Sequence, residues 1–183
     1  VYVSIAQIRR FGLRTGDLVT GKTRPSKENE RFLALLYITA VNGEDPERLS
    51  ERVPFENLVP IFPNERYTLE RTGAKNDLSI RLIDLIAPIG FGQRAMIVAP
   101  PDSGRLLMLR DICRAIKRND AESEVLMLLI DIAPEEVTEI RESVDAEVFA
   151  STFADAPETQ TRVSETMLER AERLVEDGSR IGA

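Results

Sequence analysis

The sequence predicts a chain in two parts: a small β-rich part over residues 1–52 and an α/β part with a mainly parallel sheet over residues 81–183. Seven of the ten aromatic residues lie before residue 68, among short β-like runs separated by turn residues. After residue 80, continuous apolar runs alternate with helical patterns. That order is typical of a parallel sheet whose strands are covered on both faces.

The N-terminal elements follow from local patterns. The runs "VYVSI", "DLVTGKTR" and "RFLALLYITAV" predict strands of the later part of a small β-barrel. An exception is the spacing of Ile5, Ile8 and Phe11, which predicts a short helix ended by Gly12. Residues 53–80 hold three prolines and little periodicity, so we expect an extended linker between the two parts.

The C-terminal part predicts alternating strands and helices. Residues 94–99, 124–131 and 146–152 are strand candidates. Pro134 suits the first position of a helix over residues 134–143. Two further helices are marked by apolar stripes, at Leu106, Leu109, Ile112, Cys113 and Ile116, and at Val163, Met167, Ala171, Leu174 and Val175. The last helix should end near Asp177 with Gly178 as its stop, and we expect no further strand after it.

Charge is distributed unevenly along the chain. The net charge is −7, yet residues 1–32 carry seven basic and three acidic residues, a net of +4, which leaves −11 for the remainder. A basic, partly aromatic head predicts an anionic partner for the head alone. Histidine is absent, which excludes imidazole chemistry, and with one cysteine a metal site is not expected.

Cys113 lies on a helical apolar face and is interpreted as a buried structural thiol. A single cysteine fits a reducing cytoplasm. Every apolar run falls short of the roughly 20 residues that span a bilayer, so no membrane partner is expected.

The stretch "APPDSGRLL" at residues 99–107 follows an apolar run and opens a helical pattern, where an ATPase has its phosphate-binding loop. Gly104 is retained, but Arg105 stands where a lysine neutralises phosphate oxygens, and Leu106 stands where a hydroxyl holds Mg²⁺. Taken alone, this spacing favours a plain strand-to-helix turn over a nucleotide site.

Several segments together resemble the Rho family of bacterial transcription termination factors. These are "IRRFGLRTGD", "PIGFGQRAMIVAPP", "LLIDIAPEEVTEI" and "ASTF", within a similarity that runs from Tyr2 to about Glu176. The resemblance implies the C-terminal part of a cold-shock-type OB-fold RNA-binding barrel over residues 1–52, a linker over 53–80, and the first half of a RecA-like P-loop NTPase domain over 81–183. Family members are hexameric rings that move along RNA, and they use ATP and Mg²⁺.

The resemblance also implies where a nucleotide site would lie. Its positions in this chain are Gly90, Phe91, Gly92, Gln93, Arg94, Asp102, Ser103, Gly104, Arg105, Leu106 and Leu107. The family has lysine at Asp102 and Arg105, threonine at Leu106, and its catalytic glutamate at Ile132. With these replaced, we expect a vestigial site, no bound cofactor and no ATP hydrolysis.

The RNA-binding positions implied by the resemblance retain suitable residue types. They are Tyr2, Arg10, Lys27, Glu30, Arg31 and Phe32. Aromatic rings stack on bases, cations hold phosphates, and Glu30 accepts from a cytosine amino group. The alternative interpretation is that Phe32 belongs to the barrel core and the charges form a solvated face.

Three functions therefore stay open. The first is a Rho-like protein or fragment that binds single-stranded, C-rich RNA without motor activity. The second is a non-catalytic interaction protein that joins or inhibits Rho-type rings, associates with itself, or contacts RNA polymerase. The third is an active RNA-dependent ATPase with an unusual phosphate loop. Salt separates the first two, since phosphate contacts weaken steeply as salt rises.

Overall fold

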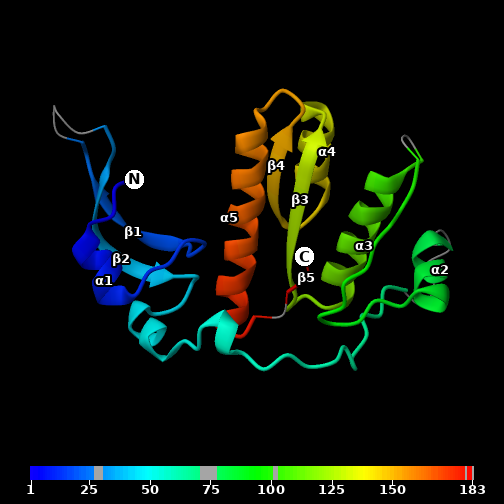
Figure 1. The fold of residues 1–183 in the computed structure, drawn as a ribbon, viewed down its shortest axis with the longest axis horizontal. Coiled ribbons are helices and arrows are strands. Elements are labelled where there is room, and N and C mark those ends of the chain that lie inside the picture. The colour runs from blue at the N-terminus through cyan, green and yellow to red at the C-terminus, as the bar shows by residue number, and fades with distance from the viewer. Residues whose placement is uncertain (27–30, 71–77, 101–102, 180, 183) are drawn as a thin grey trace. The chain divides into compact units, whose positions relative to one another are not determined.

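The structure is a computed structural model that describes residues 1–26, 31–70, 78–100, 103–179 and 181–182. The chain forms two compact units (Figure 1). Unit 1 comprises Val1–Leu58 and Leu168–Gly178, and unit 2 comprises Val59–Met167 and Ser179–Ala183. Within the described ranges, no helix is both long enough and apolar enough to cross a membrane.

Unit 1 begins with the short helix α1 (Ile5–Phe11), as the sequence predicts. The side chain of Ser4 accepts a hydrogen bond from the backbone of Gln7, and the Gln7 side chain accepts one from the backbone N–H of Ser4. This reciprocal capping box satisfies donors that the helix itself leaves free. Gly12 ends the helix in the left-handed conformation, with φ 61°.

The strands β1 (Val19–Arg24) and β2 (Ala34–Val41) form an antiparallel ribbon. Lys22 lies opposite Tyr37, and the ribbon contains two register irregularities. Gly21 permits the close approach of the strands, because a Cβ atom there would lie 2.3 Å from the carbonyl oxygen of Tyr37. The first predicted strand, "VYVSI", is reduced to a bridge between Tyr2 and Ala34, because α1 begins at Ile5.

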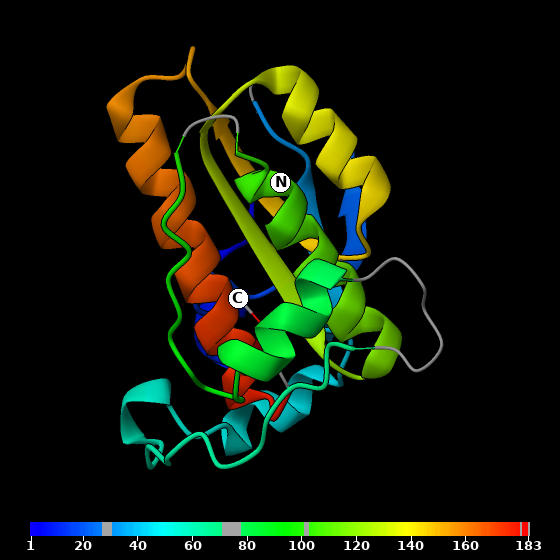
Figure 2. The same cartoon turned by 90° about the vertical axis from the view of Figure 1, so that its right-hand side faces the viewer.

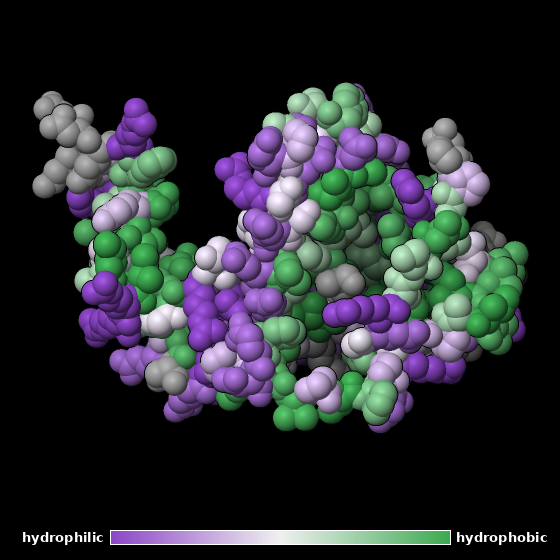
Figure 3. Space-filling model, in the orientation of Figure 1, coloured by the Kyte–Doolittle hydropathy of each residue, from purple (hydrophilic) through white to green (hydrophobic). Residues whose placement is uncertain are grey.

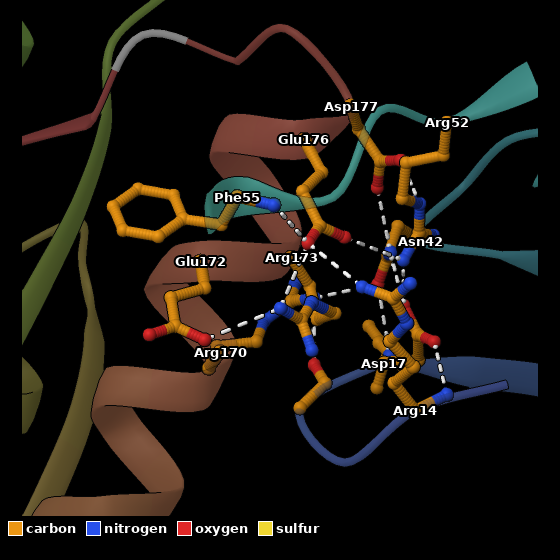
Figure 4. A network of polar contacts seen from close by, with 12 residues as sticks. Arg14, Asp17, Asn42, Arg52, Phe55, Arg170, Glu172, Arg173, Glu176 and Asp177 are labelled. Carbon is orange, nitrogen blue, oxygen red and sulfur yellow. Dashed lines mark hydrogen bonds and ion pairs between the residues drawn. The ribbon is translucent and has the colours of Figure 1, made fainter. Parts of the chain in front are cut away.

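A buried ion network holds unit 1 together (Figure 4). It joins the loop after α1, the end of β2, the 3₁₀ helices η1 (Pro46–Glu51) and η2 (Phe55–Asn57), and the last turns of α5 (Pro157–Glu176). Arg52 contacts three carboxylates: Asp17 at 2.9 Å, Asp177 at 3.0 Å and Glu176 at 3.4 Å. Burial is the main cause that raises the pKa of Asp177. The interior of this unit is therefore largely polar.

Unit 2 contains a three-stranded parallel sheet in the order β4-β3-β5. Two predicted strands and all the predicted helices are confirmed. In both ribbon views β3 runs between α3 and the first part of α5 (Figures 1 and 2). The elements are α2 (Leu78–Ile86), α3 (Arg105–Asn119), β3 (Glu124–Ile132), α4 (Pro134–Ser143), β4 (Glu147–Thr152), α5 and β5 (Ile181–Gly182). Gly178, with φ 82°, follows α5 as expected.

The apolar core belongs to unit 2. It contains residues of α3, β3 and α4, and it includes Cys113, whose thiol pKa is raised mainly by burial. Tyr67 and Leu69 also lie in this core, although they fall in the stretch expected to be an extended linker. The first segment of unit 1 ends at Leu58. Residues 53–80 contain three prolines and have no hydrophobic periodicity, so the sequence does not indicate which of these residues are buried.

Two expectations for unit 2 are wrong. Residues 94–99 form no strand: Met96 and Val98 are 85% and 86% exposed, and Ile97 alone of the three packs against the core. An apolar run becomes a strand only where a neighbouring backbone pairs with it, and β3 pairs instead with β4 and with β5. Conversely, Ile181–Gly182 does form a short strand beside Glu124 and Val125.

Helix α2 presents an apolar surface. Its sequence "LSIRLIDLI" buries Ile80 and leaves four large apolar side chains exposed, at Leu78, Leu82, Leu85 and Ile86. Figure 3 shows apolar side chains gathered at the right edge of the view, over this helix. An exposed apolar patch of this kind is typical of a surface that contacts another chain or segment.

Candidate functional site

A cavity of about 450 Å³ opens on unit 1 and gathers three of the predicted RNA-binding residues. We call it the aromatic cavity. Its lining consists of Tyr2, Ser4, Arg24, Arg31, Phe32, Ala34 and Leu35. Tyr2 and Phe32 are 57% and 63% exposed, so their rings are available to a ligand. The Phe32 ring is therefore not buried among the described residues of unit 1.

The backbone fixes the two aromatic residues beside each other. The N–H of Tyr2 donates to the carbonyl of Leu33 at 2.7 Å, and the N–H of Leu35 donates to the carbonyl of Tyr2 at 2.9 Å. These bonds align the first residues of the chain with the start of β2, directly after Phe32. Two residues 30 positions apart in the sequence thus line one cavity.

Two arginine side chains belong to the described lining of the cavity. Arg24 ends β1 and Arg31 precedes β2, and both line the cavity next to the rings. Two guanidinium groups beside two exposed aromatic rings form a combination that fits a flat, apolar group attached to an anion. A nucleotide of a single strand has this chemistry.

The remaining predicted RNA-binding residues are not in this cavity. Arg10 lies on α1 with its guanidinium carbon 5.1 Å from the centre of the Phe11 ring, and it lines a different cavity of about 480 Å³. Three acidic residues share that lining: Glu44, Asp45 and Glu47. Lys27 and Glu30 lie outside the described residues.

The predicted phosphate loop has the geometry of a turn that opens a helix. Gly104 adopts the left-handed conformation, with φ 82°, and Arg105 begins α3. The hydroxyl of Ser103 donates to the carbonyl of Pro100 at 2.6 Å. Leu106 is half-buried and packs against the apolar core, whereas Leu107 is exposed. Asp102 lies outside the described part of the chain.

The segment from Gly90 to Arg94 turns back on residues 65–67. The N–H of Phe91 donates to the carbonyl of Glu65 at 2.8 Å, and the Phe91 ring lies 3.8 Å from that of Tyr67, centre to centre. Gln93 accepts a hydrogen bond from the N–H of Gly90 at 2.8 Å, and Gly92 has φ 77°. Neither this segment nor residues 103–107 lines either of the two cavities above.

Ile132 stands at the end of β3, where the resemblance implies a catalytic glutamate. It is half-buried and packs against the apolar core. Asp131 before it has φ 60°, an uncommon value for a residue other than glycine. A register shift in the pairing with β4 accompanies this conformation, between Ile130 and Ile132.

Sequence reasoning missed four residues that line the aromatic cavity: Ser4, Arg24, Ala34 and Leu35. Ser4 is placed there by its role as the cap of α1. Arg24 belongs to the basic set of residues 1–32, and its position at the end of a predicted strand was a signal for its inclusion. The pairing of β1 with β2 then brings Arg24 opposite Ala34, which also lines the cavity.

Comparison with known proteins agrees with this geometry. The family model "Rho termination factor, RNA-binding domain" matches residues 1–47, which contain the whole aromatic cavity. Transcription termination factor Rho of Bacillus subtilis is 52% identical over 176 residues, and that of Pseudomonas aeruginosa is 51% identical over 177 residues. Salmonella typhimurium Rho is 48% identical over 177 residues.

Each of these alignments covers 96% of this chain but only 41% or 42% of the relative. The chain thus spans about two fifths of the length of the relatives it matches. It combines an RNA-binding-domain match in unit 1 with a parallel α/β sheet in unit 2. On the family match and on identity of about one half across nearly all its residues, the chain belongs to the Rho transcription termination factor family.

Proposed function

We propose that this chain binds single-stranded, C-rich RNA through the aromatic cavity of unit 1, as part of a Rho-like termination factor. The observation that carries the proposal is the joint lining of one cavity by Tyr2, Phe32, Arg24 and Arg31. The relatives are named termination factors and the matching domain is named RNA-binding, which supports the same ligand class.

The energetics favour a base held between or against the rings. Stacking of one base on an aromatic side chain contributes about 1–3 kcal/mol and tolerates any base. The two arginines add contacts to phosphate, which makes binding salt-dependent, with a slope of about −0.7 per neutralised phosphate on a log–log plot. Two such contacts predict a slope of about −1.4 from this cavity. Preference for cytosine would come from Glu30, which by family resemblance accepts from the base.

The test is a titration of a fluorescently labelled oligo(C) RNA, read by anisotropy, with the full chain and two matched variants. Phe32→Leu removes the exposed ring at the cavity, and Phe62→Leu removes a ring in unit 2 that is even more exposed. We expect Phe32→Leu to weaken binding by about 5- to 100-fold and Phe62→Leu to leave it unchanged. Equal affinities for the two variants would contradict the proposal.

We further propose that unit 1 is the later part of an OB-fold and unit 2 the first half of a RecA-like domain whose nucleotide site is vestigial. The support lies in side-chain placement. A threonine at the position of Leu106 would have to point its hydroxyl at Mg²⁺, whereas the Leu106 side chain packs against the apolar core. The hydroxyl of Ser103 donates a hydrogen bond to the carbonyl of Pro100. Ile132 has no group that orients water.

The nucleotide proposal is tested by titrating a fluorescent ATP analogue in the salt used for RNA, and by measuring phosphate release with and without oligo(C). We expect RNA binding without a nucleotide signal and without turnover. RNA-stimulated turnover that disappears in the variant Asp131→Asn would overturn it, and would favour an active ATPase with an unusual loop. A nucleotide signal without turnover would show that the loop still binds.

A second candidate is association with another chain, either a Rho-type subunit or a second copy. It is favoured by the exposed apolar side chains of unit 2, namely those of α2 together with Met96 and Val98. Sedimentation at several salt concentrations distinguishes this role, because apolar association persists as salt rises whereas RNA binding weakens. A sedimentation coefficient that is independent of concentration would count against it.

A further inference from the structure

A cross-strand pair on the β1–β2 ribbon, Lys22 and Tyr37, does not line the aromatic cavity. Lys22 on β1 lies opposite Tyr37 on β2, with its ammonium nitrogen 5.7 Å from the centre of the tyrosine ring. Lys22 is exposed, and Tyr37 is 46% exposed. A tyrosine ring that is nearly half exposed to solvent and lies beside a cation can stack with a nucleobase.

The pair lies on the same face of the ribbon as part of the aromatic cavity. Residues that face each other across an antiparallel pair share a side of the sheet, and side chains alternate along each strand. Lys22 and Arg24 are two positions apart on β1, so they lie on one face, and Arg24 with its partner Ala34 lines the cavity. From Lys22 to Arg24, β1 advances two residues while β2 advances three, from Tyr37 to Ala34. The register irregularity between Lys22 and Thr23 accounts for the additional residue of β2.

The spacing suits a polynucleotide. Two residues along a strand advance roughly 6.6 Å. This is about twice the 3.4 Å rise per stacked nucleotide. A strand with stacked bases that leaves the cavity along β1 therefore reaches the Lys22–Tyr37 pair about two nucleotides later, beyond the reach of a dinucleotide whose first base lies in the cavity.

The charges favour this direction over the one toward Arg10. Neither β1 nor β2 contains an aspartate or glutamate, and both cations of β1 lie on the cavity side. The cavity at Arg10 is lined by Glu44, Asp45 and Glu47, whose carboxylates repel a phosphate backbone.

We propose that Lys22 and Tyr37 form a second nucleobase-stacking step, with Tyr37 as the platform for a base and Lys22 as the contact to the adjoining phosphate. This inference rests on the proposed RNA binding and extends it, because it makes affinity depend on the length of the strand. An alternative role for the pair is purely structural, since cross-strand pairs of this kind stabilise a ribbon.

The test compares two ligands, the dinucleotide CpC and the hexanucleotide C6, as competitors of a labelled oligo(C) bound to the full chain. Tyr37→Thr removes the ring and keeps a residue that favours strands. We expect it to weaken C6 by about 5- to 100-fold and to leave CpC unchanged, whereas Tyr37→Phe binds both like the native chain. We expect Lys22→Gln to reduce the salt slope for C6 by about 0.7, while Arg48→Gln, an exposed cation elsewhere in unit 1, leaves it unchanged.

The outcomes separate this inference from the proposed function. If the native chain binds neither ligand, the proposed RNA binding itself fails. If the native chain binds both and Tyr37→Thr weakens neither, the second stacking step is overturned while the cavity stands. If Tyr37→Thr weakens both ligands equally, the pair supports the ribbon only. Circular dichroism of the variant, with an unchanged urea midpoint, confirms that the fold is retained.

Discussion

Arg52 is the residue whose replacement tests the ion network of unit 1 most sharply. Its side chain is 6% exposed, and its three carboxylate partners are Asp17, Glu176 and Asp177. The network contains four guanidinium groups and four carboxylates, at Arg14, Arg52, Arg170 and Arg173 and at Asp17, Glu172, Glu176 and Asp177 (Figure 4). The substitution Arg52→Met keeps much of the volume and leaves one buried negative charge uncompensated.

The expected cost is large because the broken pair is buried. Removing one partner of a buried ion pair destabilises a protein by about 3–5 kcal/mol. The net contribution of the intact network is smaller, since the Nη2 atom of Arg52 and the Nε atom of Arg173 lack hydrogen-bond partners among the described residues. A domain with a total stability of about 5–15 kcal/mol loses a substantial share of it.

Arg48→Met is the matched control. Arg48 lies in η1, four residues before Arg52, and pairs with Glu44 at 2.6 Å, but the two side chains are 70% and 60% exposed. An exposed pair contributes about 0–1 kcal/mol, so the same chemical change should have little effect there. Comparing the stability of the two variants separates the effect of breaking a buried ion pair from the effect of losing an arginine.

The assay is hydrogen–deuterium exchange of peptides that cover β2 in unit 1 and β3 in unit 2, supported by urea unfolding. We expect Arg52→Met to reduce the protection of β2 and to leave that of β3 unchanged. Unfolding of Arg52→Met and Arg48→Met at the same urea concentration would contradict this prediction, as would an equal loss of protection in β3 and β2.

Three further predictions concern single residues. Burial raises the pKa of Cys113, so the native thiol should react with a disulfide reagent at pH 8 much more slowly than the urea-unfolded chain, and equal rates would contradict its burial. Burial also raises the pKa of Asp177, so this group stabilises the fold below the ordinary aspartate pKa of about 3.9 and loses that contribution as pH rises through the folded pKa. Asp177→Asn should therefore gain urea stability relative to the native chain as the pH rises from about 3.9 to neutrality, and a constant difference would count against this assignment. Gly16→Ala places a Cβ atom 2.5 Å from the backbone of Glu169 at φ 92°, so it should lower the unfolding midpoint more than Gly43→Ala, which meets strain at φ 86° but nothing within 4 Å.

Local features of the molecule were predictable because their causes lie within a few residues of each other. Helix α1 ends at Gly12 because a left-handed residue closes the helix there, and α4 begins at Pro134 because proline suits a first turn. The apolar runs at β3 and β4 were long enough to be recognised as covered strands. The resemblance to the Rho family and three residues of the cavity, Tyr2, Arg31 and Phe32, were likewise available from the sequence.

The tertiary structure alone decided which distant residues meet. Backbone hydrogen bonds between Tyr2 and the start of β2 bring Phe32 to the aromatic cavity, and no local pattern contains them. The run at residues 94–99 has the composition of a strand and lacks a paired neighbour, so its backbone stays outside the sheet. Arg52 is one arginine among many in the sequence, and only the convergence of the loop after α1, η1 and α5 makes it the centre of a buried network. Propensity acts over one or two turns, whereas pairing and burial depend on contacts across many tens of residues.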